Sequence, residues 1–172
     1  MGSRIVFITG GSRSGKTRFA LSLGMQAPAP RLYIATAEAR DDEMRERITN
    51  HKKERHGAWE TIEETKDLAT SVSGAEKYGV LIIDCITLWM SNMIEAGLTD
   101  EGIVAEAGRL AGACRAGRAT VILISNEVGM GIVPENPLAR RFRDLSGIVN
   151  QRLAASADEV HLIASGMPLR MK

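Results

Sequence analysis

One stretch near the start of the chain constrains its fold more than any other. It joins the apolar run Ile5–Ile8 to the amphipathic segment Arg18–Leu23 and reads Gly10-Gly11-Ser12-Arg13-Ser14-Gly15-Lys16-Thr17. A strand, a turn with the spacing G-x-x-x-x-G-K-[ST] and a helix, in that order, are the context of a phosphate-binding loop, or P-loop. The alternative is a plain glycine-rich turn. Because the complete motif stands between a strand and a helix, the P-loop is favoured.

Each part of this loop has a chemical task. Gly10 and Gly15 allow backbone angles that a side chain disfavours, so successive N–H groups can turn inward around an anion. The N-terminal end of the following helix adds positive potential. We expect Lys16 to reach the β- and γ-phosphates and the Thr17 hydroxyl to bind Mg²⁺. The remaining residues of the cradle are Gly11, Ser12, Arg13 and Ser14.

Length and charge narrow the class of protein. The chain has 172 residues, which predicts a single domain over residues 1–172. Its 22 basic and 21 acidic residues give a net charge of +1, so nothing in the overall charge favours nucleic acid or an anionic membrane as a partner. The two cysteines, Cys85 and Cys114, have no metal-ligand spacing. With no apolar run long enough to span a bilayer and no signal-peptide pattern, we expect a cytoplasmic protein with reduced thiols.

Apolar strand-like runs alternate with longer amphipathic segments along the chain. The pattern predicts a P-loop NTPase-like (RecA-like) α/β fold, with a mostly parallel central sheet between two layers of helices. A short extended segment is expected at Trp59–Glu63 and a short tail after Ala164. The expected strands are Arg4–Thr9, Arg31–Ala35, Val80–Asp84, Thr120–Ser125 and Glu159–Ala164. The expected helices are Lys16–Met25, Asp41–Arg55, Glu64–Val72, Ile86–Ala96, Asp100–Ala116 and Pro137–Ala157.

Polar residues end several of these strands, at the sheet edge where ligands bind in such folds. Asp84 follows four apolar residues, as does the metal-orienting carboxylate of P-loop enzymes. Asp84 could instead cap the helix that begins near Ile86, but the complete P-loop favours the metal role. The segments Ala35–Ala37 and Ser125–Glu127 end two further strands and converge on the same place.

A basic helix face is the second candidate feature. Arg47, His51 and Arg55 are spaced by four residues and therefore share one face of the helix Asp41–Arg55. A neutral imidazole is a competent nucleophile toward phosphorus, and flanking guanidinium groups can bind the polyphosphate under attack. On spacing alone, a solvated basic face is the favoured interpretation.

The loop Asn126–Asn136 is the third, because its glycines and prolines give it a defined shape after a buried strand. From the residues alone it could also be an ordinary connection. With this loop the sequence resembles the bifunctional adenosylcobinamide kinase/adenosylcobinamide-phosphate guanylyltransferase family of cobalamin biosynthesis. The resemblance runs nearly end to end, through Gly10–Thr17, Tyr33–Ala37, Asp41–Met44, Arg47-Ile48, His51, Trp59–Glu63, Asn126–Asn136, Phe142–Asp144 and Val149–Ala154.

The resemblance implies two reactions. A nucleoside triphosphate, ATP or GTP, phosphorylates adenosylcobinamide, and GTP then transfers GMP to that phosphate through a guanylylated histidine. His51 stands at the matching position, which makes the nucleophile the favoured interpretation of that residue. By the same resemblance Ala35, Thr36 and Ala37 line the nucleotide, Glu63 accepts guanine N–H groups, and Asp84 stands where some members carry glutamate.

The resemblance also implies a homo-oligomer, a trimer. The apolar helix Ile86–Ile94 could supply contact surface, although an apolar helical stripe more often belongs to the core. Two other functions remain open at this point. One is a P-loop small-molecule kinase without nucleotidyl transfer, and the other is a GTP-binding regulatory module without catalysis.

Overall fold

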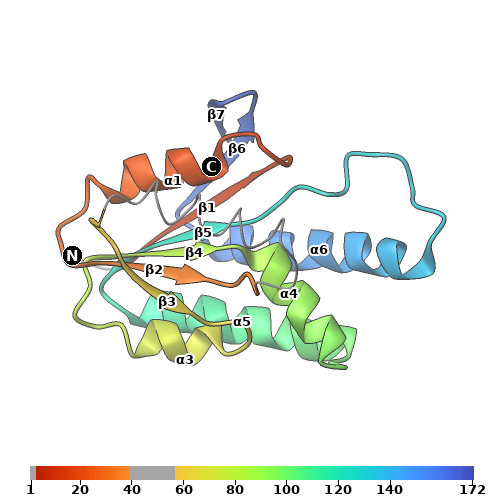
Figure 1. Ribbon diagram of the computed structural model, residues 1–172, viewed down its shortest axis with the longest axis horizontal. Coiled ribbons are helices and arrows are strands. Elements are labelled where there is room, and N and C mark those ends of the chain that lie inside the picture. The colour runs from red at the N-terminus through yellow and green to blue at the C-terminus, as the bar shows by residue number, and fades with distance from the viewer. Residues whose placement is uncertain (1–2, 39–56) are drawn as a thin grey trace.

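The computed structural model describes residues 3–38 and 57–172, and its strands form one seven-stranded sheet in the order β3-β2-β4-β5-β1-β6-β7 (Figure 1). Every pairing in it is parallel except that of β6 with β7. The strands are β1 (Arg4–Gly10), β2 (Arg31–Ala35), β3 (Glu60–Glu63), β4 (Val80–Asp84), β5 (Thr120–Ile124), β6 (Glu159–Ala164) and β7 (Met167–Arg170). The helices are α1 (Lys16–Gly24), α3 (Leu68–Ser73), α4 (Ile86–Glu95), α5 (Asp100–Ala116) and α6 (Pro137–Ser156).

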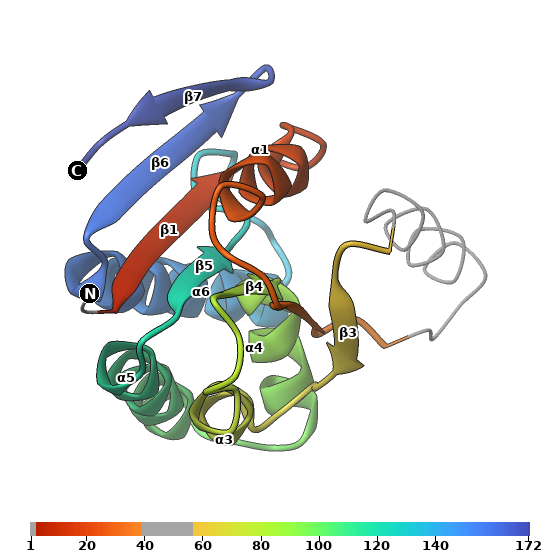
Figure 2. The same cartoon turned by 90° about the vertical axis from the view of Figure 1, so that its left-hand side faces the viewer.

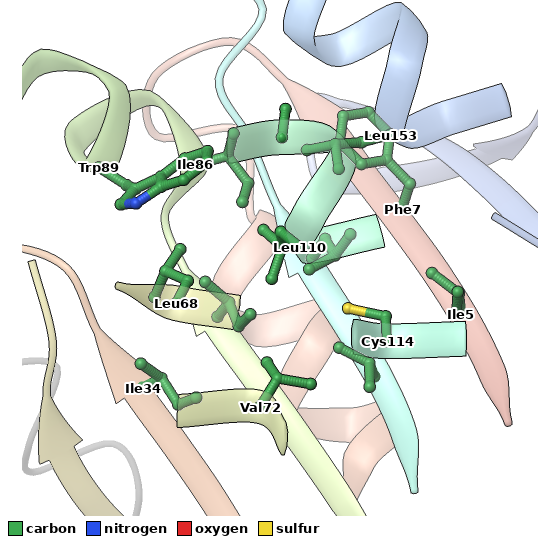
Figure 3. Close-up of a cluster of buried hydrophobic side chains, with 14 of the residues drawn as sticks. Ile5, Phe7, Ile34, Leu68, Val72, Ile86, Trp89, Leu110, Cys114 and Leu153 are labelled. Carbon is green, nitrogen blue, oxygen red and sulfur yellow. The ribbon is translucent and has the colours of Figure 1, made fainter. Parts of the chain in front are cut away.

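The expected three-layer α/β fold is confirmed by the way the strands bury both faces. Along β1, Ile5 and Phe7 belong to the core cluster under α3, α4, α5 and α6, whereas Val6 and Ile8 belong to the cluster under α1. Figure 1 shows α1 on one side of the sheet and α3 and α5 on the other. Figure 3 shows side chains of the larger cluster, where Leu110 and Leu153 from two helices lie over the strands. Burial on both faces explains why the strands read as continuous apolar runs.

The apolar stripe of α4 belongs to the core. Ile86, Trp89, Met90 and Met93 are each no more than 2% exposed and pack in the larger cluster. The indole N–H of Trp89 donates to the Lys66 carbonyl oxygen at 2.7 Å, which satisfies its one polar atom. Any contact surface between copies of this chain must therefore come from other residues.

Two elements near the ends of strands differ from the expectation. The helix expected over Glu64–Val72 begins only at Leu68, because the Glu64 carboxylate accepts from the backbone N–H groups of Lys66 and Asp67 at 2.8 and 2.9 Å. Asp67 then caps the helix by accepting from the Thr70 N–H at 3.2 Å. Local bonds of this kind compete with helical ones and delay the helix start.

The expected tail after Ala164 is in fact the strand β7. Ser165 and Gly166 both have positive φ, 50° and 80°, and form a two-residue turn that folds β7 back on β6. Such turns match the twist of paired strands and are the usual connection of a tight hairpin. Pro168 cannot donate a backbone hydrogen bond, which is tolerated because β7 is the edge of the sheet.

The strand order places the P-loop and Asp84 on strands that are not neighbours. β5 lies between β1, which leads into the P-loop, and β4, which ends at Asp84. Figure 2 shows β7, β6, β1 and β5 side by side, with β3 toward the opposite edge. Because these strands are parallel, their carboxyl ends lie at one edge of the sheet.

Within the described part of the chain, none of the helices has both the length and the apolar composition to cross a bilayer.

Candidate active site

The P-loop has a backbone that only glycine fits at one of its ends. Gly10 has a φ of 152°, and a Cβ there would lie 2.4 Å from the Ile163 carbonyl oxygen. Gly15, at the N-cap of α1, has a φ of 100°. Arg13, between them, adopts a positive φ of 55°. The chain therefore turns sharply between β1 and α1, as a loop that wraps an anion must.

Lys16 carries a buried cation into this loop. Its side chain is 8% exposed, and Nζ donates to the carbonyl oxygens of Gly10 and Gly11 at 2.9 and 2.7 Å. The ammonium thus crosses back over the turn that precedes it. A cation held by neutral carbonyls at a helix N-terminus favours an anionic ligand, and phosphate is the anion that this loop shape fits.

Thr17 and Asp84 meet although they come from separate elements. The Thr17 hydroxyl donates to Asp84 Oδ2 at 3.0 Å, and the half-buried carboxylate also accepts from the Tyr33 hydroxyl at 2.5 Å. The N-cap of α4 is Cys85, so Asp84 does not cap that helix. A hydroxyl that donates its proton to a carboxylate keeps its oxygen lone pairs for a cation. Thr17 and Asp84 therefore have the oxygen chemistry that Mg²⁺ takes when it is held with substrate phosphates.

Thr36 fixes the backbone beside Asp84. Its hydroxyl donates to the Cys85 carbonyl oxygen and accepts from the Cys85 N–H, each at 2.7 Å. Its backbone N–H donates to the Asp84 carbonyl oxygen at 3.0 Å, and Asn92 donates to the Thr36 carbonyl at 3.0 Å. The Thr36 side chain is fully buried by these contacts, between the more accessible Ala35 and Ala37.

The loop that begins at Asn126 is attached to the P-loop. The Glu127 N–H donates to the Gly10 carbonyl oxygen at 3.0 Å, and Asn126 donates to the Thr87 hydroxyl at 2.8 Å. Beyond this anchored start the loop is exposed, with Met130 79% and Ile132 97% accessible. Figure 1 shows the segment projecting away from the sheet before it enters α6.

The cysteine next to Asp84 is chemically quiet. Burial, with the negative charge of Asp84, raises the pKa of the Cys85 thiol to about 11. The thiol contacts the Thr87 hydroxyl at 3.1 Å. Since the thiolate is the nucleophile and is scarce at neutral pH, Cys85 serves packing and not covalent chemistry.

The other predicted site residues are not gathered at the P-loop by the described structure. Glu63 ends β3, and β2, β4 and β5 separate it from β1, a spacing of roughly 19 Å at the usual distance between strands. Arg47, His51 and Arg55 lie outside the described residues. The roles of these four residues stay predictions.

Comparison with known proteins identifies the family of this chain. Residues 6–171 match the family model of CobU, cobinamide kinase/cobinamide phosphate guanyltransferase. The chain belongs to this family. The resemblance noted from the sequence is thereby confirmed, and a P-loop α/β fold is the one expected of a CobU-family chain.

Three curated relatives extend the match over nearly the whole chain. The bifunctional adenosylcobalamin biosynthesis protein CobU of Salmonella typhimurium (strain LT2) is 42% identical, and the alignment covers 98% of this chain and 99% of the relative. CobU of Escherichia coli (strain K12) is 39% identical with the same coverage. CobP of Pseudomonas aeruginosa (strain ATCC 15692) is 37% identical, over 96% of this chain and 95% of the relative.

One residue of this CobU-family site escapes sequence reasoning. Tyr33 stands in the expected strand Arg31–Ala35 and in a segment that carries the family resemblance, but neither points to a site role for its side chain. The structure places its hydroxyl against Asp84. The one usable signal was its position two residues before the end of a strand whose carboxyl end was already predicted to line the site.

Proposed function

We propose that this chain catalyses two successive reactions. In the first, ATP or GTP phosphorylates the hydroxyl of adenosylcobinamide. In the second, GTP transfers GMP to adenosylcobinamide phosphate, giving adenosylcobinamide-GDP and pyrophosphate. The observation that carries the proposal is the hydrogen bond between Thr17 of the P-loop and Asp84 in a chain of the CobU family.

The residues of the P-loop have distinct tasks in this proposal. The backbone of Gly10–Thr17 surrounds the phosphates, and Lys16 exchanges its contacts with two carbonyls for contacts with phosphate oxygens. Thr17 and Asp84 hold Mg²⁺ beside the same phosphates. Bound Mg²⁺ supplies neutralisation of the charge that develops on the phosphoryl oxygens.

His51 supplies the covalent step of the second reaction. A ring nitrogen of His51 attacks the α-phosphorus of GTP, so a P–N bond forms, the bond to the bridging oxygen breaks and pyrophosphate leaves. A phosphate oxygen of adenosylcobinamide phosphate then attacks the same phosphorus, and the P–N bond breaks. Arg47 and Arg55, on the same predicted helix face, bind the anionic groups.

Labelled GTP tests this assignment directly. Incubation with [α-³²P]GTP should leave one acid-labile, base-stable label on the protein, and His51→Ala should abolish it. His56→Ala is the matched control, since His56 lies five residues further along and off the predicted face. Equal labelling of His51→Ala would overturn the covalent step. Phosphorylation of adenosylcobinamide without any label would favour the simple kinase, and GTP binding without turnover would favour the regulatory module.

We also propose that the chain acts in the cytoplasm as a homo-oligomer, a trimer by family resemblance. Two exposed apolar surfaces support association. One is on the loop and the start of α6 (Val128, Met130, Ile132, Val133 and Leu138), and the other is on β7 and its end (Met167, Leu169 and Met171). Figure 1 shows that the loop before α6 and the strand β7 project from different parts of the molecule. A closed ring joins each protomer to the next through two different surfaces of this kind.

Sedimentation analysis tests the assembly. Ile132→Asp and Leu169→Asp should each reduce the sedimenting mass to that of one chain. Met25→Asp, at an exposed apolar residue that belongs to neither surface, is the control and should leave the mass unchanged. A monomeric unsubstituted protein at micromolar concentration would contradict this part of the proposal.

A further inference from the structure

We propose that Tyr33 is a positioning residue that holds Asp84 in the orientation needed for the Mg²⁺–nucleotide complex. The Tyr33 hydroxyl donates to Asp84 Oδ2 at 2.5 Å, and the Thr17 hydroxyl donates to the same oxygen at 3.0 Å. A hydroxyl–carboxylate bond this short is typical of a charge-assisted hydrogen bond. The inference rests on the proposed binding of Mg²⁺ and a nucleoside triphosphate.

The sheet register explains why a tyrosine two residues from the end of β2 reaches this carboxylate. β2 and β4 are parallel neighbours in which Tyr33 pairs with Ile82 and Ala35 pairs with Asp84. Since side chains alternate along a strand, those of Ile82 and Asp84 point to the same face of the sheet. Tyr33 and Ile82 both belong to the core cluster under α1, so Tyr33 lies on that face too. Asp84 is therefore the next residue after Ile82 on this face of β4, and the long side chain of Tyr33 reaches diagonally to it.

The phenol ring is also held by packing against Trp59. Tyr33 is 2% exposed and meets the Trp59 ring edge to face, with centroids 6.4 Å apart and planes at 84°. Trp59 is in turn packed against the end of α1, where a Cβ on Gly24 would lie 2.5 Å from the indole. The hydroxyl therefore has little freedom to leave Asp84, because rigid packing surrounds the ring that carries it.

This contact bears on metal binding through Thr17. For the Thr17 oxygen to offer lone pairs to a cation, its proton must point away from the cation and toward Asp84. That requires Asp84 Oδ2 to stay in place. Thr17 donates one hydrogen bond to this oxygen, and Tyr33 donates another from a rigid ring. Tyr33 thus acts on the metal through Asp84 and Thr17, without touching either metal or substrate.

Calorimetric titration with the β,γ-imido analogue of GTP tests the inference, once with Mg²⁺ and once with EDTA. Tyr33→Phe keeps the ring and removes the hydroxyl. Affinity in EDTA should change less than about twofold, and the gain in affinity that Mg²⁺ gives should fall about tenfold, the equivalent of one charge-assisted hydrogen bond. Tyr78→Phe is the matched control, because Tyr78 is also buried but lies beside Glu60 and Lys77. It should leave both affinities unchanged.

A double substitution separates positioning from general packing. If Tyr33 acts through Asp84, Tyr33→Phe should have less than about a twofold effect on Mg²⁺-dependent affinity in an Asp84→Asn background. An equal loss in both backgrounds, or an equal loss with EDTA and with Mg²⁺, would overturn the role. So would loss of all binding in EDTA, which would make the role structural. Unsubstituted protein whose affinity does not depend on Mg²⁺ would instead overturn the proposed metal–nucleotide site itself.

Discussion

The backbone N–H of Gly166 donates to the Ser14 carbonyl oxygen at 2.9 Å. The turn of the C-terminal hairpin is thereby bonded to the middle of the P-loop. Gly10, the first residue of the loop, lies against the Ile163 carbonyl oxygen of β6. The nucleotide loop near the N-terminus is therefore shaped by the last two strands of the chain.

Replacement of Gly10 tests this close approach. Gly10→Ala should lower the free energy of unfolding by about 2 kcal/mol or more, because the added Cβ meets backbone at 2.4 Å and the φ of 152° disfavours a side chain. Gly11→Ala, where a Cβ meets nothing within 4 Å, is the stability control. Urea unfolding followed by circular dichroism measures both. Equal stability of the two variants would mean that β6 moves away at little cost.

Removal of the Lys16 ammonium should weaken phosphate binding. Lys16→Ala is expected to raise the dissociation constant for GTP about 100-fold, since a cation buried among carbonyls is lost from the phosphate site. Lys77→Ala is the control, because Lys77 is an exposed lysine paired with Glu60 at 3.4 Å. Fluorescence titration with a labelled GTP analogue compares them. Unchanged affinity for Lys16→Ala would place the phosphates elsewhere.

Asp158 should make stability depend on acid pH. The pKa of its carboxyl group is lowered from the usual 3.8. The main cause is the hydrogen bond that the carboxylate accepts from the Ile5 N–H at 2.7 Å, and the contact with Arg115 adds to it. A carboxylate with a lowered folded-state pKa stabilises the fold above its unfolded value and loses that contribution as pH falls through the folded value. Asp158→Ala should cost about 1 kcal/mol at neutral pH, a figure that allows for solvent screening of a 41% exposed side chain.

This cost should shrink as the pH is lowered from the usual 3.8 of a free aspartate through the lowered pKa of the folded protein, because the folded state loses the charge of Asp158 over that range. Asp144→Ala, at a carboxylate that is 70% exposed, should change stability by less than about 0.5 kcal/mol at neutral or acid pH. A cost at Asp158 that stays constant across the acid range would show that its value lies in packing and not in ionisation.

Both thiols should resist modification by Ellman's reagent in the folded protein. Burial raises the pKa of Cys114 to about 12 and, with the charge of Asp84, that of Cys85 to about 11. At about pH 8 very little thiolate is present to react. Ellman's reagent should therefore titrate no thiol in buffer and both after denaturation. Fast reaction of one thiol in buffer, absent from Cys85→Ser, would indicate opening of the sheet edge at Asp84.

The sequence was sufficient for the parts of the fold that follow one strong local pattern. The apolar runs that end at Ile8, Asp84 and Ile124 are buried strands, and the G-x-x-x-x-G-K-[ST] spacing lies between strand and helix. β7 could not be predicted, because Pro168 argues against a strand and Ser165 adopts its positive φ only in the tertiary fold. Pairing with β6 outweighs the local preference.

The site was predictable where one residue type has one chemistry. The Thr17 hydroxyl bonds Asp84 and the Lys16 ammonium bonds carbonyls of the P-loop turn, while the roles of all three in binding stay predictions. Thr36 was expected to line the nucleotide, but its bonds to Cys85 were not foreseen, and Tyr33 had no expected site role. Both side chains bond groups at the end of β4, and a pattern along one strand carries no information about such bonds. Arg47 and His51 lie outside the described residues, so their places in the site stay predictions.

The place of β1 in the sheet has a consequence for how a cell makes this chain. β1 is synthesised among the first residues, yet both of its neighbours, β5 and β6, come more than a hundred residues later. At usual translation speeds this wait is on the order of ten seconds. During it Ile5–Ile8, an apolar strand with both edges unpaired, has emerged from the ribosome. The strand that leads into the P-loop therefore completes its pairing only after nearly the whole chain has been synthesised.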